Sequence, residues 1–218
     1  MLPTSLCGVS QQGAFRVAFV PGVTPGKWLG IWRERERSPL EATLVEEDAQ
    51  LRVLHDGSAD MCFVRLPVDR EGLHVIPLYR EVGVVVVPLE HLLTVLDEVS
   101  VADLSDEQVL VGSSELPGWA EIAAAEPLDL PAMTTKQAIE VVASGTGVVV
   151  VPMSVARLHH RRDVTMRPIV DAPESQIALA WRTDLDDPRA DTFVGIVRGR
   201  TARSTRGETP AGKRRRPR

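Results

Sequence analysis

The chain has 218 residues, enough to bury one sizeable core or two small lobes, and its 44% hydrophobic content is ordinary for a soluble protein. It contains no run of about 18 apolar residues, and its first residues lack a secretion signal, so we expect no membrane span and no export. Cys7 and Cys62 stand in unlike surroundings, which favours unpaired thiols in a reducing cytoplasm over a disulfide framework.

The net charge of −5 is unevenly distributed. Residues 198–218 contain nine basic residues and one acidic residue, Glu208, which gives this segment a net charge of +8. Residues 1–197 therefore carry a net charge of −13. An acidic body repels a phosphate backbone, whereas the tail GKRRRPR attracts one weakly and without sequence preference. Two interpretations remain: residues 201–218 are a disordered, solubilising end, or they contact nucleic acid, in which case deleting residues 213–218 removes a salt-dependent DNA affinity.

Strands and helices alternate along the first third of the chain. The residue pattern predicts strands at 15–20, 40–45 and 61–66 and helices at 27–37 and 49–56. Residues 40–45 alternate apolar and polar side chains, which is typical of a strand near a sheet edge. Asp48 is expected to cap the second helix and Gly57 to end it.

The middle of the chain is rich in β-branched residues. Residues 73–88 predict a long strand passage and residues 109–112 a short strand. Leu89, Leu92, Leu93 and Leu96 have helical spacing, so periodicity alone predicts a helix there.

The most informative segment is VVASGTGVVVVP at residues 141–152. Thr134 and Thr135 precede an amphipathic helical pattern, and Gly145 and Gly147 permit the left-handed backbone that ends a helix. Four consecutive valines then predict a strand buried on both faces, which Pro152 ends while opening the next helix. A strand at 175–182 and a helix at 188–197 follow, and the alternation predicts mainly parallel sheets wrapped by helices.

Catalytic chemistry is scarce in this sequence. No two histidines have the i, i+4 spacing of a zinc hydrolase, and His159 and His160 are expected at a solvated helix end. No nucleophile elbow, Walker loop or dinucleotide fingerprint is present, and the pair Glu46 and Glu47 is expected to face solvent. We therefore predict no catalytic residue, no metal site and no cofactor.

A binding site is predicted where strands end and helices start. Thr24, Ser113, Ser114, Thr134 and Thr135 offer hydroxyls and free backbone N–H groups that suit a small anion, although each is equally a simple helix cap.

Arg65 is the sharper candidate. It ends the apolar run MCFV, where a guanidinium is costly unless it finds an anion. It either grips a ligand carboxylate or forms a salt bridge with an acidic side chain, and both alternatives stay open.

Five motifs in register over residues 15–200 resemble the effector-binding (substrate-binding) domain of LysR-type transcriptional regulators, a relative of type 2 periplasmic binding proteins. They are FRVAFVPG, LRVLHDGSADMCFVRLP with Gly57 and Asp60, LHVIPLYREVGVVVVP, the segment after it with a short helix at 102–106, and AIEVVASGTGVVVVPMSVARL. The resemblance implies an α/β fold of two Rossmann-like lobes joined by two crossover strands. It places an irregular N-terminus at 1–13, lobe one at 14–82 plus 167–200, lobe two at 83–166 and the tail at 201–218.

The resemblance also implies the function. The chain would be a cytoplasmic sensor that binds a small organic acid, including aromatic and dienoic acids to which members with RLP at residues 65–67 respond. The effector cleft would involve Val23 or Thr24, where the family has serine or threonine, together with Arg65, Ser113, Ser114 and Thr134. A homodimer is expected, or a heterodimer with a full-length relative.

Two departures from the family pattern matter. The family's His-Pro-Leu is replaced by His91, Leu92 and Leu93, so we expect a loop with a short helical turn. No winged helix-turn-helix precedes the first strand, so we expect no sequence-specific DNA binding by this chain alone. Two other classes on the same fold stay open: a solute-binding protein of periplasmic type, which needs export, and a cytoplasmic enzyme, which needs a titratable cluster in the cleft.

Overall fold

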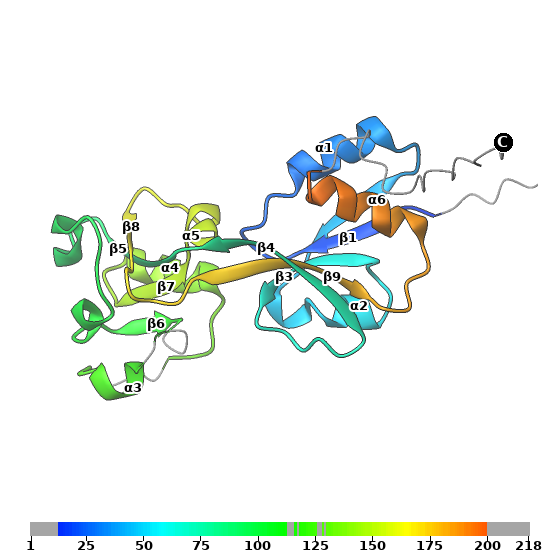
Figure 1. Ribbon diagram of the computed structural model, residues 1–218. Coiled ribbons are helices and arrows are strands. Elements are labelled where there is room, and N and C mark those ends of the chain that lie inside the picture. The colour runs from blue at the N-terminus through cyan, green and yellow to red at the C-terminus, as the bar shows by residue number, and fades with distance from the viewer. Residues whose placement is uncertain (1–12, 113–115, 117, 126–127, 129, 200–218) are drawn as a thin grey trace, which may run out of the picture.

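The chain folds into two β-sheets covered by helices and passes between them twice (Figure 1). The computed structural model describes residues 13–112, 116, 118–125, 128 and 130–199. Predictions for residues 1–12, Ser113, Ser114 and the basic tail therefore lie outside the described residues. None of the described helices is long and apolar enough to cross a membrane.

Lobe one is built on a five-stranded sheet in the order β2-β1-β3-β9-β4. Its strands are β1 (Phe15–Phe19), β2 (Leu40–Leu44), β3 (Met61–Leu66), β4 (Leu73–Glu81) and β9 (Ser175–Arg182). Helices α1 (Gly26–Arg35) and α6 (Pro188–Val197) cover one face, and α2 (Arg52–His55) lies on the other (Figure 1). As expected, β2 is an edge strand.

Lobe two is built on a four-stranded sheet in the order β6-β7-β5-β8. Its strands are β5 (Gly83–Pro88), β6 (Val109–Val111), β7 (Val148–Pro152) and β8 (Val164–Pro168). Helices α4 (Thr135–Ala143) and α5 (Met153–Leu158) pack on one face. The short helices η2 (Leu92–Val95), η3 (Ala102–Leu104) and α3 (Trp119–Ile122) lie against the other.

The strand directions are mixed, so the prediction of mainly parallel sheets is wrong. β1 pairs in parallel with β2 and β3, and β6 with β7, but β9 runs antiparallel to β3 and β4, and β5 antiparallel to β7 and β8. The reason is topological: a strand that enters a lobe from its neighbour runs against strands that began inside that lobe. The α/β fold of two lobes and two crossovers is confirmed.

The crossovers are short. One residue, Val82, separates β4 from β5, and residues 169–174 separate β8 from β9. Arg167 and Pro168 still pair with β5, so the strand that returns to lobe one begins later than the expected boundary at 167.

The predicted helix stop and buried strand at residues 134–152 are confirmed. Thr134 caps α4 in a capping box with Gln137. Gly145 and Gly147 have φ values of +88° and +64°, and every residue of β7 is buried. A Cβ atom at Gly147 would lie 2.3 Å from the carbonyl oxygen of Gln108, so glycine is required there by contact as well as by backbone conformation.

The segment after β2 departs from its prediction. Asp48 does not cap a helix over 49–56 but lies inside the 3-10 helix η1 (Glu47–Ala49), and α2 begins only at Arg52. A hydrogen bond links the residues between η1 and α2 to β3: the backbone N–H of Arg65 donates to Gln50 Oε1 at 2.8 Å. This tertiary bond fixes the position of Gln50 between η1 and α2.

The segment after β5 is a loop with one short helical turn, as expected from the missing proline. The turn is η2, and His91 Nδ1 caps it by accepting from the N–H of Leu93 at 3.3 Å. Helical periodicity alone was misleading because Leu92 is 84% exposed and only Leu93 of η2 is buried.

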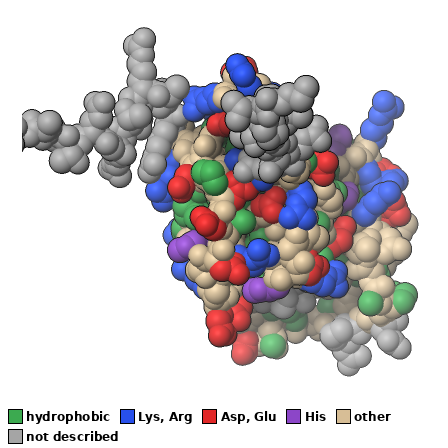
Figure 2. Space-filling view, turned by 90° about the vertical axis from the view of Figure 1, so that its right-hand side faces the viewer, with side chains coloured by type: hydrophobic (Ala, Val, Ile, Leu, Met, Phe, Trp, Pro, Cys, Tyr) green, Lys and Arg blue, Asp and Glu red, His purple; other side chains and the backbone are tan. Residues whose placement is uncertain are grey.

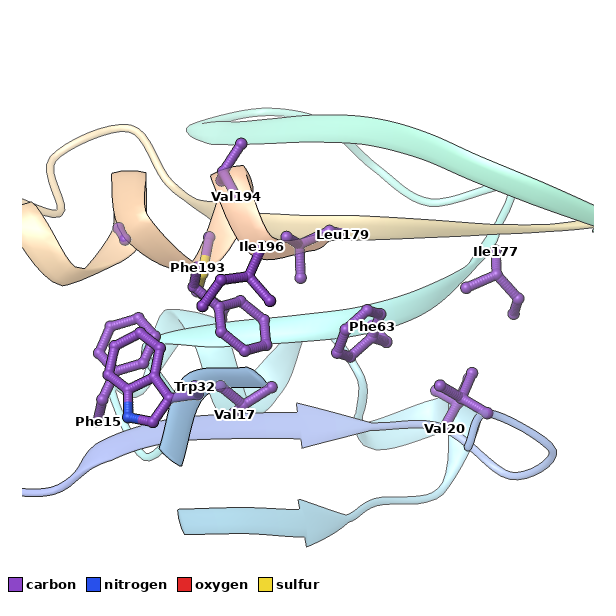
Figure 3. Close-up of a cluster of buried hydrophobic side chains, with 13 residues drawn as sticks. Phe15, Val17, Val20, Trp32, Phe63, Ile177, Leu179, Phe193, Val194 and Ile196 are labelled. Atoms are coloured by element: carbon purple, nitrogen blue, oxygen red, sulfur yellow. The ribbon is translucent and has the colours of Figure 1, made fainter. Parts of the chain in front are cut away.

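The two lobes have different cores. All four phenylalanines of the chain lie in lobe one, where Phe15 stacks on Trp32 at a centroid distance of 5.2 Å and Phe193 packs edge-on to Trp32 and Phe63 (Figure 3). Lobe two is packed mainly by valines, and β5 and β7 supply eight of them. Lobe one thus uses large aromatic area, whereas lobe two relies on β-branched side chains in a sheet buried on both faces.

Gly145 and Gly147 form a matched pair for a stability test. We expect Gly145→Ala to lower the free energy of unfolding by about 1–2 kcal/mol, the cost of a left-handed backbone at a non-glycine residue. Gly147→Ala should lower it further, because its methyl group would also collide with the carbonyl oxygen of Gln108, whereas nothing lies within 4 Å of a Cβ at Gly145. Urea denaturation measures both, and equal losses would contradict the contact argument.

Candidate functional site

A cavity of about 730 Å³ lies between the two lobes. Lobe one contributes the ends of β1 and β2, through Pro21, Leu44, Glu46, Glu47 and Asp48. Lobe two contributes the end of β6, the start of α4, the end of β7, and Val155 and Leu158 of α5. Strand ends and helix starts from both lobes thus meet at one cleft, the usual location of a ligand in open α/β sheets.

The start of α4 provides the polar wall of lobe two. Thr134 Oγ1 accepts from the N–H of Gln137 at 3.3 Å, and Gln137 Oε1 accepts from the N–H of Thr134 at 2.9 Å. These two bonds occupy the cap, but within the described residues no hydrogen bond uses the N–H of Thr135 or Lys136. Both residues line the cavity, so the positive end of α4 lies at the wall of the cleft.

The wall of lobe one is acidic. Glu46, Glu47 and Asp48 follow the edge strand β2 and line the cavity. Glu47 pairs with Arg65, while no ion pair within the described part of the chain involves Glu46 or Asp48. The cleft therefore has donors on one side and carboxylates on the other.

Two exposed leucines line the cleft, one from each lobe. Leu44 of lobe one is 52% exposed and Leu158 of lobe two 53% exposed, and both line the cavity. Exposed leucines on both lobes at one cavity suit a ligand with a hydrophobic body.

Arg65 has salt-bridge partners in this structure. Its Nε lies 2.7 Å from Glu47 Oε1, and its Nη1 lies 2.7 Å from Glu81 Oε2 and 2.6 Å from Ser175 Oγ. Burial lowers the pKa of the guanidinium, but the two carboxylates raise it above its ordinary value, so Arg65 stays charged. It does not line the cavity and reaches it only through Glu47 and the carbonyl oxygen of Pro21.

The other predicted site residues fall in different places. Thr134 lines the cavity. Val23 packs in the core of lobe one at 4% exposure, and Thr24 is exposed without lining the cavity. Ser113 and Ser114 lie outside the described residues, directly after Gly112, which lines the cavity.

Sequence reasoning missed the acidic wall and Lys136. Glu46 and Glu47 are exposed, as expected, but they line the cleft between the lobes. Their position after a strand was the available signal, because the ends of neighbouring parallel strands meet at one sheet edge. His159, expected at a solvated helix end, follows α5 and also lines the cavity.

The described residues contain no cluster of three or more side chains suited to a metal ion. Cys62 is fully buried in β3, and burial raises the pKa of its thiol to about 12. At neutral pH this thiol is protonated and shielded, so it is a core residue and a poor nucleophile.

A family model described as the LysR substrate binding domain matches residues 9–202. The chain belongs to the LysR substrate-binding domain family. The two-lobed fold and the cleft just described are those expected for such a domain, and the resemblance inferred from the five sequence motifs is confirmed.

Two curated relatives are similar over most of the chain. The HTH-type transcriptional regulator AlsR of Bacillus subtilis (strain 168) is 26% identical over 202 residues, which cover 85% of this chain and 66% of that protein. A probable hydrogen peroxide-inducible genes activator of Mycobacterium avium is 26% identical over 186 residues, which cover 82% of this chain and 55% of that protein. The chain thus spans less than two thirds of the length of these LysR relatives.

Solved structures share the LysR-domain fold. The BenM effector-binding domain with its effector benzoate has a TM-score of 0.70 and 21% identity, covering 91% of this chain and 96% of that one. The reduced form of the OxyR regulatory domain from Pseudomonas aeruginosa has a TM-score of 0.67 and 22% identity, covering 86% of this chain and 98% of that one. At this level of identity the comparison shows the fold.

The setting of Cys62 can be tested by thiol labelling. In a Cys7→Ser background, we expect Cys62 to stay unreacted with a thiol reagent at pH 8 in the native chain and to react fully in denaturant, because burial and its raised pKa both suppress the thiolate. Mass spectrometry counts the label. Fast labelling of the folded chain would contradict the buried setting.

Proposed function

We propose that this domain is the cytoplasmic sensor of a LysR-type regulator and binds a small carboxylate, including aromatic acids, in the interlobe cleft. One observation carries the proposal: Thr135 and Lys136 at the start of α4 line a cavity of about 730 Å³, and within the described residues no hydrogen bond uses their N–H groups. Free N–H groups at a helix start bind carboxylates through charge-assisted hydrogen bonds.

The rest of the cleft supports an acid with a hydrophobic body. With its carboxylate at the start of α4, the ligand would extend toward the exposed side chains of Leu44 and Leu158. The acidic wall of lobe one would turn the carboxylate toward α4, because like charges at Glu46 and Asp48 disfavour the opposite orientation. Benzoate, the effector named for BenM, is a suitable first probe.

The predicted effector residues have different roles in this proposal. Thr134 would shape the carboxylate site by holding the start of α4 in its capping box. Ser113 and Ser114 would approach the ligand from the end of β6, and Thr24 from the loop that begins at Pro21. A carboxylate would reach Arg65 only by displacing Glu47, so direct contact with Arg65 is the least supported part of the site.

The response to the ligand would be a change in the angle between the lobes that alters a dimer surface, in a homodimer or in a heterodimer with a full-length relative. Nucleic-acid contact by this domain would be weak and confined to the basic tail. Acidic and basic side chains alternate over the end of lobe one shown in Figure 2, and the body carries a net charge of −13. Neither feature favours a phosphate backbone.

Peroxide sensing is a second candidate, because the relatives include an OxyR domain and a peroxide-inducible activator. The pKa of Cys62, raised to about 12, argues against its use as a peroxide-reactive thiolate. Carboxylate binding is therefore preferred. Family membership likewise favours a regulator's sensor over a solute-binding protein or an enzyme on this fold.

The proposal is tested by removing one backbone donor. Thr135 is the first residue of α4, where proline is compatible with the helix but has no N–H. We expect Thr135→Pro to weaken carboxylate binding at least tenfold, since a hydrogen bond to a charged group contributes about 1.5–3 kcal/mol. Thr135→Ala keeps the N–H group and is the matched control.

Binding partners are found first by thermal-shift screening of aromatic and dienoic acids, beginning with benzoate, and their affinities are measured by calorimetry. Lys136→Gln should also weaken binding, because it removes the one lysine side chain among the described residues that line the cleft. Absence of any stabilising carboxylate, or equal affinities for Thr135→Pro and Thr135→Ala, would rule out the α4 site.

A further inference from the structure

Arg65 is the one charged side chain that is buried among the described residues, at 6% exposure. It lies near the end of β3, and four hydrogen bonds from its guanidinium reach four separate segments of lobe one. Two of these segments border the cleft, and the other two are the lobe-one ends of the crossovers.

On the cleft side, Arg65 Nε donates to Glu47 Oε1 at 2.7 Å and Nη2 donates to the carbonyl oxygen of Pro21 at 3.0 Å. Glu47 and Pro21 both line the interlobe cavity, and the Glu47 side chain is 44% exposed. A molecule in the cleft can therefore touch both partners without touching Arg65 itself.

The two crossovers together form the hinge between the lobes. On the hinge side, Nη1 of Arg65 donates to Glu81 Oε2 at 2.7 Å and to Ser175 Oγ at 2.6 Å. Glu81 is the last residue of β4, Ser175 is the first residue of β9, and the two face each other in the sheet. Only Val82 lies between Glu81 and the first strand of lobe two. Nη1 thus fixes the points at which both crossovers leave lobe one.

The two sides cannot move independently. A guanidinium is planar and holds its donors in a fixed fork, so a rotation that follows one partner changes the direction of the bonds to the others. The Glu81 side chain is only 10% exposed, and a buried carboxylate is stabilised in its charged form by its paired cation. A change at Glu47 therefore alters how firmly Arg65 holds Glu81.

We propose that Arg65 couples the cleft to the hinge: Glu47 on the cleft wall sets the orientation of the Arg65 guanidinium, which in turn sets the lobe-one ends of both crossovers. Arg65 is in this role a positioning residue, and Glu47 is the residue through which a ligand acts on the lobes. The regulatory meaning rests on the proposed function, because it takes the cleft as the effector site. Coupling of this kind is reciprocal, so the angle between the lobes also affects ligand affinity.

The test measures the distance between the lobes in the full chain without any ligand. Spin labels are placed at Glu71→Cys in lobe one and Leu92→Cys in lobe two, both exposed, in a Cys7→Ser background; Cys62 is buried and stays unlabelled. Pulsed electron paramagnetic resonance gives the distance distribution. Glu47→Ala is compared with Glu46→Ala. Both variants remove a carboxylate from the same wall of the cleft, but within the described residues only Glu47 forms an ion pair.

We expect Glu47→Ala to shift or broaden the interlobe distance distribution and Glu46→Ala to leave it unchanged. Glu47 is a better choice than Arg65 for the first variant, because Arg65→Ala leaves Glu81 buried and unpaired and endangers folding. A distribution for Glu47→Ala identical to that of Glu46→Ala would overturn the proposal. No ligand is used, so failure of the coupling is independent of whether the cleft binds a carboxylate.

Discussion

The architecture depends on one constraint: the chain leaves lobe one after β4 and must return to complete it. The returning strand β9 lies between β3 and β4, so without it the five-stranded sheet is divided. Ile177 and Leu179 of β9 are also buried in the aromatic core of lobe one. Lobe one is therefore not a continuous segment of the chain, because its sheet and core are completed by a strand that follows lobe two in the sequence.

The parts of the fold that sequence predicted are those with local causes. The cap at Thr134, the glycines at 145 and 147 and the valine run of β7 act within a few residues, and each was recognised. Strand direction in the sheets was predicted wrongly because it depends on where the chain enters each lobe, which no local pattern records.

The site shows the same division between local and distant causes. The start of α4 was expected at a ligand edge because threonines before a helix are visible in sequence. The partners of Arg65 could not be identified from the sequence, because Glu47, Glu81 and Ser175 are 18, 16 and 110 residues away along the chain. Val23 shows a finer limit: in a short loop, sequence does not show which of two neighbours turns inward, and here Val23 enters the core while Thr24 stays outside.

The crossover at Val82 has a mechanical consequence. The connection is a single residue, and hydrogen bonds hold both Val82 and the residue after it. Met153 N–H donates to the carbonyl oxygen of Val82 at 3.0 Å, and Ile169 N–H donates to the carbonyl oxygen of Gly83 at 2.9 Å. A one-residue connection leaves little length for the two strands to move apart, so a change in the relative position of the lobes requires rotation of the backbone near Val82. Under the proposed function, a wider ligand in the cleft would hold the two lobes at a larger angle, so the size of the ligand would determine the position of lobe two.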